Sequence, residues 1–349
     1  MNEILGAAAP TPLQDGFHFP AEWEQHRRTW MCWPARGECF GGAEGILRAK
    51  QAYARVARAI SSFEPVTLAA RPYEVAEARL ATGGKVDVVE MPLDDSWARD
   101  FGPTFLKNGM GRLAGVQWEF NAWGRKYHPY ANDAVFASRV TEAIGARVYT
   151  APLICEGGAL HSDGKGTVLT TEQCLLNPNR NPGLSKREIE ELLEAYLGAR
   201  SVIWLGDGFS DMETDGHIDN IACFAGPGRV ILGVPPARSH PDYIPVQDAL
   251  QRLTAVRDAE GRPLEIVELP QPKKQRLSWA GQLLSASYVN FYLVNGALIM
   301  PAFDDPNDEA ARTILAQCFP GRDIMQIDAL DIVQGGGGIH CITQQEPAV

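Results

Sequence analysis

The carboxyl end of the chain places a cysteine beside a run of glycines. Gly335–Gly338 precede Cys341 by only a few residues. Because glycine has no Cβ, backbone of this kind can approach a ligand closely. The pattern predicts a thiol nucleophile for a small, flat electrophile. The alternative is a buried structural cysteine that follows a flexible turn.

A histidine and an aspartate lie close together in the segment Thr214–Asn220. Side chains alternate in an extended segment, so His217 and Asp219 are predicted to point to the same side. Histidine is the natural proton shuttle near neutral pH. The alternative is a histidine that is simply satisfied by its neighbouring aspartate.

Two further acids lie in front of predicted hairpins. Asp100 could hold a cation, and Trp97 could form an aromatic wall for the stem that carries it; the alternative is a surface turn with an Arg99 salt bridge. Glu156 comes just before two glycines. A carboxylate among apolar residues must find a partner or shift its pKa, although an ordinary turn also fits.

Together these residues supply a thiol, an imidazole and three carboxylates. An amide hydrolase would instead need donors for an oxyanion. Acids around a thiol suit a guanidinium, whose five N–H donors form a planar fork that binds carboxylates. Holding this cation between acids would align its carbon with the sulfur.

The composition bounds the class of protein. The 349 residues are 45% hydrophobic and 21% charged, which is typical of a soluble globular protein of one large or two ordinary domains. No apolar run spans a bilayer and no signal peptide is expected at the start. Seven scattered cysteines indicate a reducing cytoplasm, and no metal-binding motif is evident. The net charge of −11 disfavours nucleic acid and anionic membranes.

The elements that must position these residues form a repeat. Glycine-bearing turns between β-branched and aromatic runs predict hairpins over 101–118, 159–171, 218–234 and 288–300. Apolar residues at helical spacing predict helices over 44–63, 131–144, 185–196 and 308–318, with Ser185 and Glu188 as a capping box. Short strands are predicted over 66–70, 86–90, 147–150, 201–205, 264–268 and 323–327.

The polar residues stand where hairpins begin, roughly 60 residues or a multiple of that apart, which predicts modules around an axis. Asp100, Glu156, His217 and Cys341 each open one unit, whereas the hairpin from Tyr288 has no such group. A strand over 28–33 is predicted to close the ring against the C-terminal strand, which would remove exposed sheet edges.

The chain resembles the agmatine deiminases, a peptidyl-arginine deiminase-like group within the guanidine-modifying superfamily. The resemblance covers nearly the whole chain. It is carried by Phe19–Glu24, Asp94–Asp100, Phe120–Gly124, Glu156–Gly158, Asn177–Pro182, Glu213–Asn220 and Gly335–Gln345.

This resemblance implies an α/β fold, namely a five-bladed α/β-propeller (pentein) of pseudo-fivefold ββαβ repeats, as a single domain over 1–349. It implies hydrolysis of agmatine to N-carbamoylputrescine and ammonia, a step of putrescine and polyamine biosynthesis, through a covalent cysteine thiouronium. No cofactor is required. A cytoplasmic homodimer without nucleic-acid or membrane partners is expected.

The family pattern also implies roles for single residues. Cys341 matches the nucleophile and His217 the general acid and base; Asp100 and Asp219 match the acids that hold the guanidinium, and Glu156 orients substrate and histidine. The expected substrate contacts are Trp97, Trp123, Glu213 and Gly338. No arginine in the matching motifs would clamp an α-carboxylate, which favours agmatine over arginine.

Three alternatives remain open from the sequence. The same chemistry could act on free or peptidyl arginine. An amine instead of water could resolve the intermediate, which would make the protein an amidinotransferase. A propeller that only binds a partner would not be expected to keep the cysteine, histidine and acids together.

Overall fold

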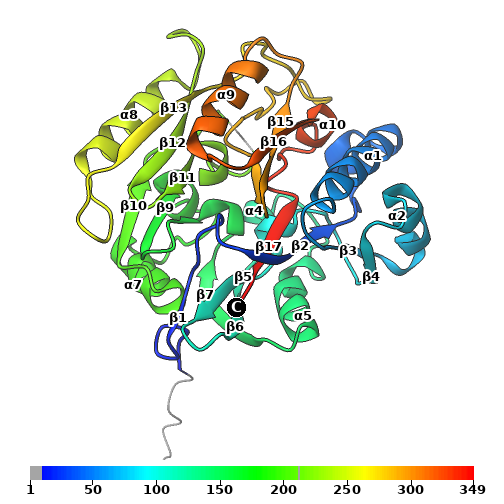
Figure 1. Cartoon of the computed structure of the whole chain (residues 1–349), viewed down its shortest axis with the longest axis horizontal. Helices are drawn as coiled ribbons and strands as arrows, with labels where there is room; N and C mark the ends of the chain where they lie inside the picture. Colours follow the sequence, from blue (N-terminus) through cyan, green and yellow to red (C-terminus); the bar gives the residue numbers. More distant parts are fainter. Residues whose placement is uncertain (1–9, 211–212) are drawn as a thin grey trace, which may run out of the picture.

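The structure is a computed structural model that describes residues 10–210 and 213–349. Over these residues the chain forms a mixed α/β fold of five separate sheets. Helices lie around the outside of the strands (Figure 1). None of the described helices is long and apolar enough to cross a membrane. The sequence region in which no signal peptide is expected falls almost wholly on residues 1–9, which lie outside the described part.

Four of the sheets share one connection pattern: an antiparallel hairpin followed by a parallel strand. A parallel connection needs a crossover, and a helix supplies it in the regular case. The strands are β5 (Thr104–Asn108), β6 (Leu113–Glu119) and β7 (Arg147–Ile154); β8 (His161–Ser162), β9 (Thr167–Thr171) and β10 (Ser201–Leu205); β11 (Ala222–Gly226), β12 (Arg229–Val234) and β13 (Glu265–Pro270); β14 (Tyr292–Val294), β15 (Ala297–Ala302) and β16 (Asp323–Asp328).

The fifth sheet joins the two ends of the chain. Strand β17 (Thr343–Pro347) pairs antiparallel with β2 (His26–Cys32), placing Gln344 opposite Trp30. Strands β3 (Val66–Ala70) and β4 (Asp87–Glu90) continue this sheet in parallel. The predicted pairing of an N-terminal with the C-terminal strand is confirmed, and it anchors the backbone that carries Cys341. A short strand β1 (Phe17–His18) extends the β5 sheet.

The helices between the strands present apolar faces to the sheets. The predicted capping box is present: the Ser185 hydroxyl accepts from the Glu188 backbone N–H, and the Glu188 side chain accepts from the Ser185 N–H. The longer helices are α1 (Ala43–Ile60), α2 (Val75–Thr82), α5 (Phe136–Ala143), α7 (Lys186–Leu197), α8 (Tyr243–Ala255) and α9 (Asp308–Cys318). Helix α5 is shorter than predicted because residues 133–135 form a separate 3₁₀ turn, and α2 and α8 were not predicted.

The sequence predicts that several hairpins begin a few residues earlier than they do. In the structure, short helical turns occupy or directly precede these positions and come before the first strand. These turns are α3 (Ala98–Phe101), η4 (Gly157–Ala159) and η5 (Ile218–Asn220). The predicted extended segment through His217 and Asp219 is therefore wrong, because residues 218–220 form a 3₁₀ turn. The remaining short elements are η1 (Glu38–Phe40), η2 (Pro72–Glu74), η3 (Asp133–Val135), α4 (Ala122–Arg125), α6 (Glu172–Leu175) and α10 (Leu330–Val333).

Candidate active site

The predicted site residues come from the backbone just in front of separate sheets. Asp100 lies in α3 ahead of β5, Glu156 at the start of η4 ahead of β8, and His217 at the start of η5 ahead of β11. Cys341 lies directly ahead of β17. All four residues are buried. The repeated fold thus brings groups that are far apart in the sequence to one place.

The side chains of His217, Asp100 and Asp219 converge on the position of Gly158. A Cβ built on Gly158 would lie 2.6 Å from His217 Nδ1, 2.7 Å from Asp100 Oδ1 and 3.0 Å from Asp219 Oδ2. Although the extended segment was wrongly predicted, His217 and Asp219 do face a common position. The bare backbone of Gly158 leaves the space that these three side chains need.

Replacing Gly158 by alanine should therefore disable the site without removing an active-site group. The new methyl must push His217 and Asp100 apart, and misplacement by about 1 Å can cost about 100-fold in rate. We expect kcat/KM for agmatine, the substrate that the sequence resemblance implies, to fall by roughly that factor. Gly109→Ala is the matched control, because a Cβ at Gly109 meets nothing within 4 Å. Equal activity of the two variants would contradict the conclusion that these side chains meet beside Gly158 in a functional site.

Cys341 lies among acids instead of among cations. Its Sγ is 3.4 Å from Asp219 Oδ2. Burial first, and then the charges of Asp219 and Asp100, raise the pKa of the thiol well above its usual value. The sulfur is therefore protonated in the free protein. A cation bound between the sulfur and the acids would stabilise the thiolate.

His217 lies between two carboxylates. Its Nδ1 is 3.6 Å from Asp100 Oδ1, and its Nε2 is 3.5 Å from Glu156 Oε2. Burial alone would lower the pKa of the imidazole, but Asp100, Cys174 and Glu156 together raise it well above its usual value. The ring is thus an imidazolium at neutral pH and is ready to donate a proton to a leaving group.

Arg180 holds Glu156 from the other side. Its Nε donates to Glu156 Oε1 at 2.7 Å, and its Nη1 donates to Asp215 Oδ2 at 2.9 Å. Burial would raise the pKa of Glu156, but Arg180 and His217 lower it, so the carboxyl group stays ionised. Removing one partner of a buried ion pair typically costs about 3–5 kcal/mol. Sequence reasoning gave Arg180 no role, although it belongs to the motif Asn177–Pro182.

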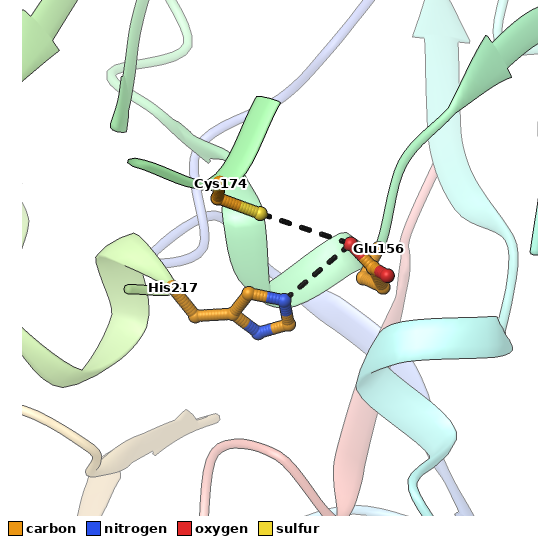
Figure 2. Close-up of side chains that lie close together, drawn as sticks. All are labelled: Glu156, Cys174 and His217. Atoms are coloured by element: carbon orange, nitrogen blue, oxygen red, sulfur yellow. Dashed lines mark hydrogen bonds and ion pairs between the residues drawn. The ribbon is translucent and has the colours of Figure 1, made fainter. Parts of the chain in front are cut away.

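Figure 2 shows a third group beside Glu156 and His217, the thiol of Cys174. Its Sγ is 3.8 Å from Glu156 Oε2. One ligand atom each of Glu156, Cys174 and His217 lies within 4.8 Å of the others, close enough to hold a metal ion. The guanidinium of Arg180 on the same carboxylate opposes a second cation there. We therefore interpret the cluster as a support that orients His217.

Asp100 is held by two donors. Trp123 Nε1 donates to Asp100 Oδ2 at 2.8 Å, and the Gly158 backbone N–H donates to Oδ1 at 3.2 Å. Trp123 adopts a φ of 54°, which L side chains rarely do and which often marks functional sites. Burial, opposed by the charge of His217, raises the pKa of Asp100 to about 6.

The activity should therefore fall in acid as Asp100 is protonated. The Asp100 carboxylate, which the sequence predicts as a partner of a guanidinium, is present above pH 6 and is lost as the pH drops through about 6. Because kcat/KM reports the free enzyme, its acidic limb should lie near that pH. The acidic limb of the kcat profile should lie at a lower pH, since a bound cation stabilises the carboxylate. A kcat/KM that stays level down to pH 5 would contradict this assignment.

A second buried network fixes Asp219. His340 Nδ1 lies 2.9 Å from Asp219 Oδ2, and His340 Nε2 lies 2.9 Å from Glu22 Oε1. Arg99 Nη1 donates to the same Glu22 oxygen at 3.2 Å. Burial would raise the pKa of Asp219, but the hydrogen bond and charge of His340 lower it. The sequence motifs contain Glu22 and His340, yet their contact across the fold could not be deduced from them.

A pocket leads to the sulfur from outside. Its lining includes Cys341, Asp100, Trp97, Trp123 and Glu213, together with Cys39, Tyr127, Thr214 and Gly335–Gly337. An outer cavity of about 420 Å³ shares Cys39, Tyr127, Glu213, Gly335 and Gly336 with this inner pocket but borders neither Asp100 nor Cys341. Glu213 therefore lies at the junction of the two, where its Oε2 accepts a hydrogen bond from Tyr127 at 2.7 Å.

The predicted substrate contacts divide into two groups. Trp97, Trp123 and Glu213 border the inner pocket, and Trp97 packs parallel to Phe40. Gly338 lies against Asn290 instead, and a Cβ on it would be 2.4 Å from Asn290 Oδ1. The role of Gly338 as a substrate contact stays a prediction.

The fold and this buried cysteine, histidine and acid site can be compared with known proteins. The model of the Porphyromonas-type peptidyl-arginine deiminase family matches residues 18–347. Agmatine deiminases of Pseudomonas aeruginosa and Ectopseudomonas mendocina are 45% and 44% identical, and each alignment covers 97% of both chains. The solved agmatine deiminase of Enterococcus faecalis has a TM-score of 0.93 at 38% identity and covers 100% of both chains.

The chain belongs to the Porphyromonas-type peptidyl-arginine deiminase family. The resemblance to agmatine deiminases that the sequence motifs indicate is confirmed by relatives that match over nearly their full length.

Proposed function

We propose that this protein is an agmatine deiminase that converts agmatine and water to N-carbamoylputrescine and ammonia. The observation that carries the proposal is the division of groups between the inner pocket and the outer cavity. The thiol, Asp100 and the indoles of Trp97 and Trp123 border only the inner pocket, whereas Glu213 also borders the outer cavity. This division suits a guanidinium and aliphatic stem in the inner pocket and a terminal amine near Glu213.

The lining of the pocket favours agmatine over arginine. None of the described residues that border the inner or outer pocket is arginine or lysine. An α-carboxylate would be expected to have such a partner, because buried charges are paired in proteins. A terminal ammonium instead finds the carboxylate of Glu213. The names of the relatives point in the same direction.

The first half of the reaction joins the sulfur to the substrate. The bound guanidinium is held by Asp100 and Asp219 and lowers the pKa of the thiol, whose proton passes to solvent. The thiolate attacks the guanidinium carbon and a C–S bond forms. His217 donates its proton to the departing nitrogen, the C–N bond breaks and ammonia leaves. A thiouronium on Cys341 remains.

The second half releases the product. Water occupies the place of the ammonia, and the now neutral His217 accepts its proton. The water oxygen attacks the carbon, the C–S bond breaks and its electron pair returns to the sulfur. The carbon keeps the oxygen, whose remaining proton passes to the thiolate and restores the thiol, and the carbon becomes the ureido group. Asp100 and Glu156 hold His217 in place between the two proton transfers.

We further propose that the five sheets are the blades of one propeller domain over residues 1–349. The shared hairpin-and-parallel pattern and the β17–β2 pairing support this arrangement. A homodimer in the cytoplasm remains part of the proposal. Sedimentation at several protein concentrations tests the oligomeric state, and fractionation of cells tests the location.

Release of ammonia from a panel of guanidines tests the function. Agmatine should have the highest kcat/KM. Arginine should be a poor substrate because its α-carboxylate finds no arginine or lysine among the described residues that border the two pockets, and a peptidyl arginine because its α-nitrogen is an uncharged amide. Glu213→Gln should raise KM for agmatine more than it lowers kcat. Preference for a peptidyl arginine, or a product that forms only when an amine is added, would overturn the proposal.

A further inference from the structure

We propose that Asn290 is a catalytic residue that donates a hydrogen bond to the thiolate of Cys341. Asn290 Nδ2 lies 3.2 Å from Cys341 Sγ. The inference rests on the proposed function and deepens it, because it names a side-chain donor that favours the thiolate of a sulfur among acids. Neither the sequence motifs nor the repeat assigned a role to this residue.

The topology places Asn290 where the other units place their site residues. It lies directly ahead of β14, as Cys341 lies ahead of β17 and His217 ahead of η5 and β11. The hairpin from Tyr288 was the one unit for which the sequence supplied no reactive group. With Asn290, each of the five sheets has a site residue ahead of a strand of its antiparallel pair: β5, β8, β11, β14 or β17.

The orientation of the Asn290 amide is fixed by a backbone donor. The His340 N–H donates to Asn290 Oδ1 at 2.9 Å, and a backbone N–H can only donate. The oxygen therefore faces the His340 N–H, and the NH₂ group is the nearer of the two amide groups to the sulfur: Nδ2 lies 3.2 Å from Sγ, and Oδ1 lies 3.6 Å from it and can accept from the neutral thiol. The same nitrogen donates to Asn220 Oδ1 at 3.1 Å and lies 3.3 Å from the Asp219 carbonyl oxygen. The side chain is buried, so these contacts hold it in one position.

The last glycine of the run in front of Cys341 makes this contact sterically feasible. A Cβ on Gly338 would lie 2.4 Å from Asn290 Oδ1 and 3.1 Å from Asn290 Cβ. Any other residue at 338 would push the amide away from the sulfur. The glycine run thus has two uses: Gly335–Gly337 border the pocket, and Gly338 admits Asn290.

The electrostatics of the sulfur show why a donor matters. Asp219 Oδ2 lies 3.4 Å from Sγ and opposes its negative charge. The backbone N–H of Gly338 and the Asn290 side chain act in the opposite direction, since their hydrogen bonds lower the pKa of the thiol. A hydrogen bond to a charged group in a dry site changes the equilibrium by roughly 10- to 100-fold. Losing the Asn290 hydrogen bond should reduce the thiolate fraction by that factor.

The test follows alkylation of Cys341 by iodoacetamide, with the modified peptide located by mass spectrometry. Asn290→Asp keeps the shape and removes the donor, and Asn290→Leu removes it without adding charge. The rate of alkylation rises with pH as the thiol of Cys341 ionises, and the midpoint of that rise reports the pKa of the thiol. In both variants the rate of alkylation should fall roughly 10- to 100-fold at each pH below the midpoint, and the midpoint should move up by about one to two pH units. kcat/KM for agmatine should fall at least as much.

Asn307→Asp is the control, because it makes the same change at a buried asparagine that donates to the Gln271 carbonyl. An unchanged pH profile in either folded Asn290 variant would overturn the inference, and so would a loss of rate that is as large above the midpoint as below it. Alkylation does not depend on deimination. If the inference about Asn290 fails but alkylation of Cys341 in the parent still blocks ammonia release, the proposed function stands.

Discussion

Replacing Cys341 by alanine is expected to abolish ammonia release from agmatine, lowering kcat by more than about 10⁴-fold. The C–S bond of the intermediate cannot form without the sulfur. Asp100, Asp219 and the indoles of Trp97 and Trp123 remain, so agmatine should still bind. Calorimetric titration of the variant would measure that binding, and coupled detection of ammonia would measure the turnover.

Cys318→Ala is the control for the loss of a buried thiol. Cys318 ends α9 and does not border the pocket, so its removal should leave kcat/KM near that of the parent. A Cys341→Ala enzyme that turns over at the parent rate would show that the sulfur is not the nucleophile.

Replacing His217 by glutamine should lower kcat by roughly 10²- to 10⁴-fold. Glutamine fills much of the same volume and can still bond to Glu156, but it cannot deliver and recover a proton. Both halves of the reaction should slow, since one imidazole serves both. The variant should also lose the part of the pH profile that depends on the imidazolium.

His18→Gln provides the comparison, because His18 lies on β1 and does not border the pocket. The proton-shuttle role would be wrong if His217→Gln kept more than about a tenth of the parent kcat. Circular dichroism of both variants checks that the buried network around Arg180 and Glu156 is intact.

The sequence predicts the hairpins well because their signals are local. Glycine turns between β-branched runs placed the pairs β5–β6, β8–β9, β11–β12 and β14–β15, and the predicted strand 201–205 coincides with β10. The hairpin starts were placed too early, since the short turns α3 and η5 carry apolar residues that also fit a strand. The sequence did not predict helix α8.

The site was only partly predictable. Residue type and motif identify Cys341, His217 and the acids, and the structure brings them together in one place. Contacts across sheets have no local signature, so the pairing of Arg180 with Glu156 and of Glu22 with His340 could not be deduced. The place of Asn290 just ahead of a hairpin strand marks it as a candidate site residue. Its amide is neither charged nor nucleophilic, so the residue type alone does not indicate a catalytic role.

The most direct measurement of the central claim is mass spectrometry of enzyme quenched in acid during turnover of agmatine. The account predicts an adduct on the Cys341 peptide with the mass of agmatine less one ammonia, which decays as the ureido product appears. Turnover at the full rate without that adduct, or with the adduct on Cys39 or Cys174 instead, would contradict it.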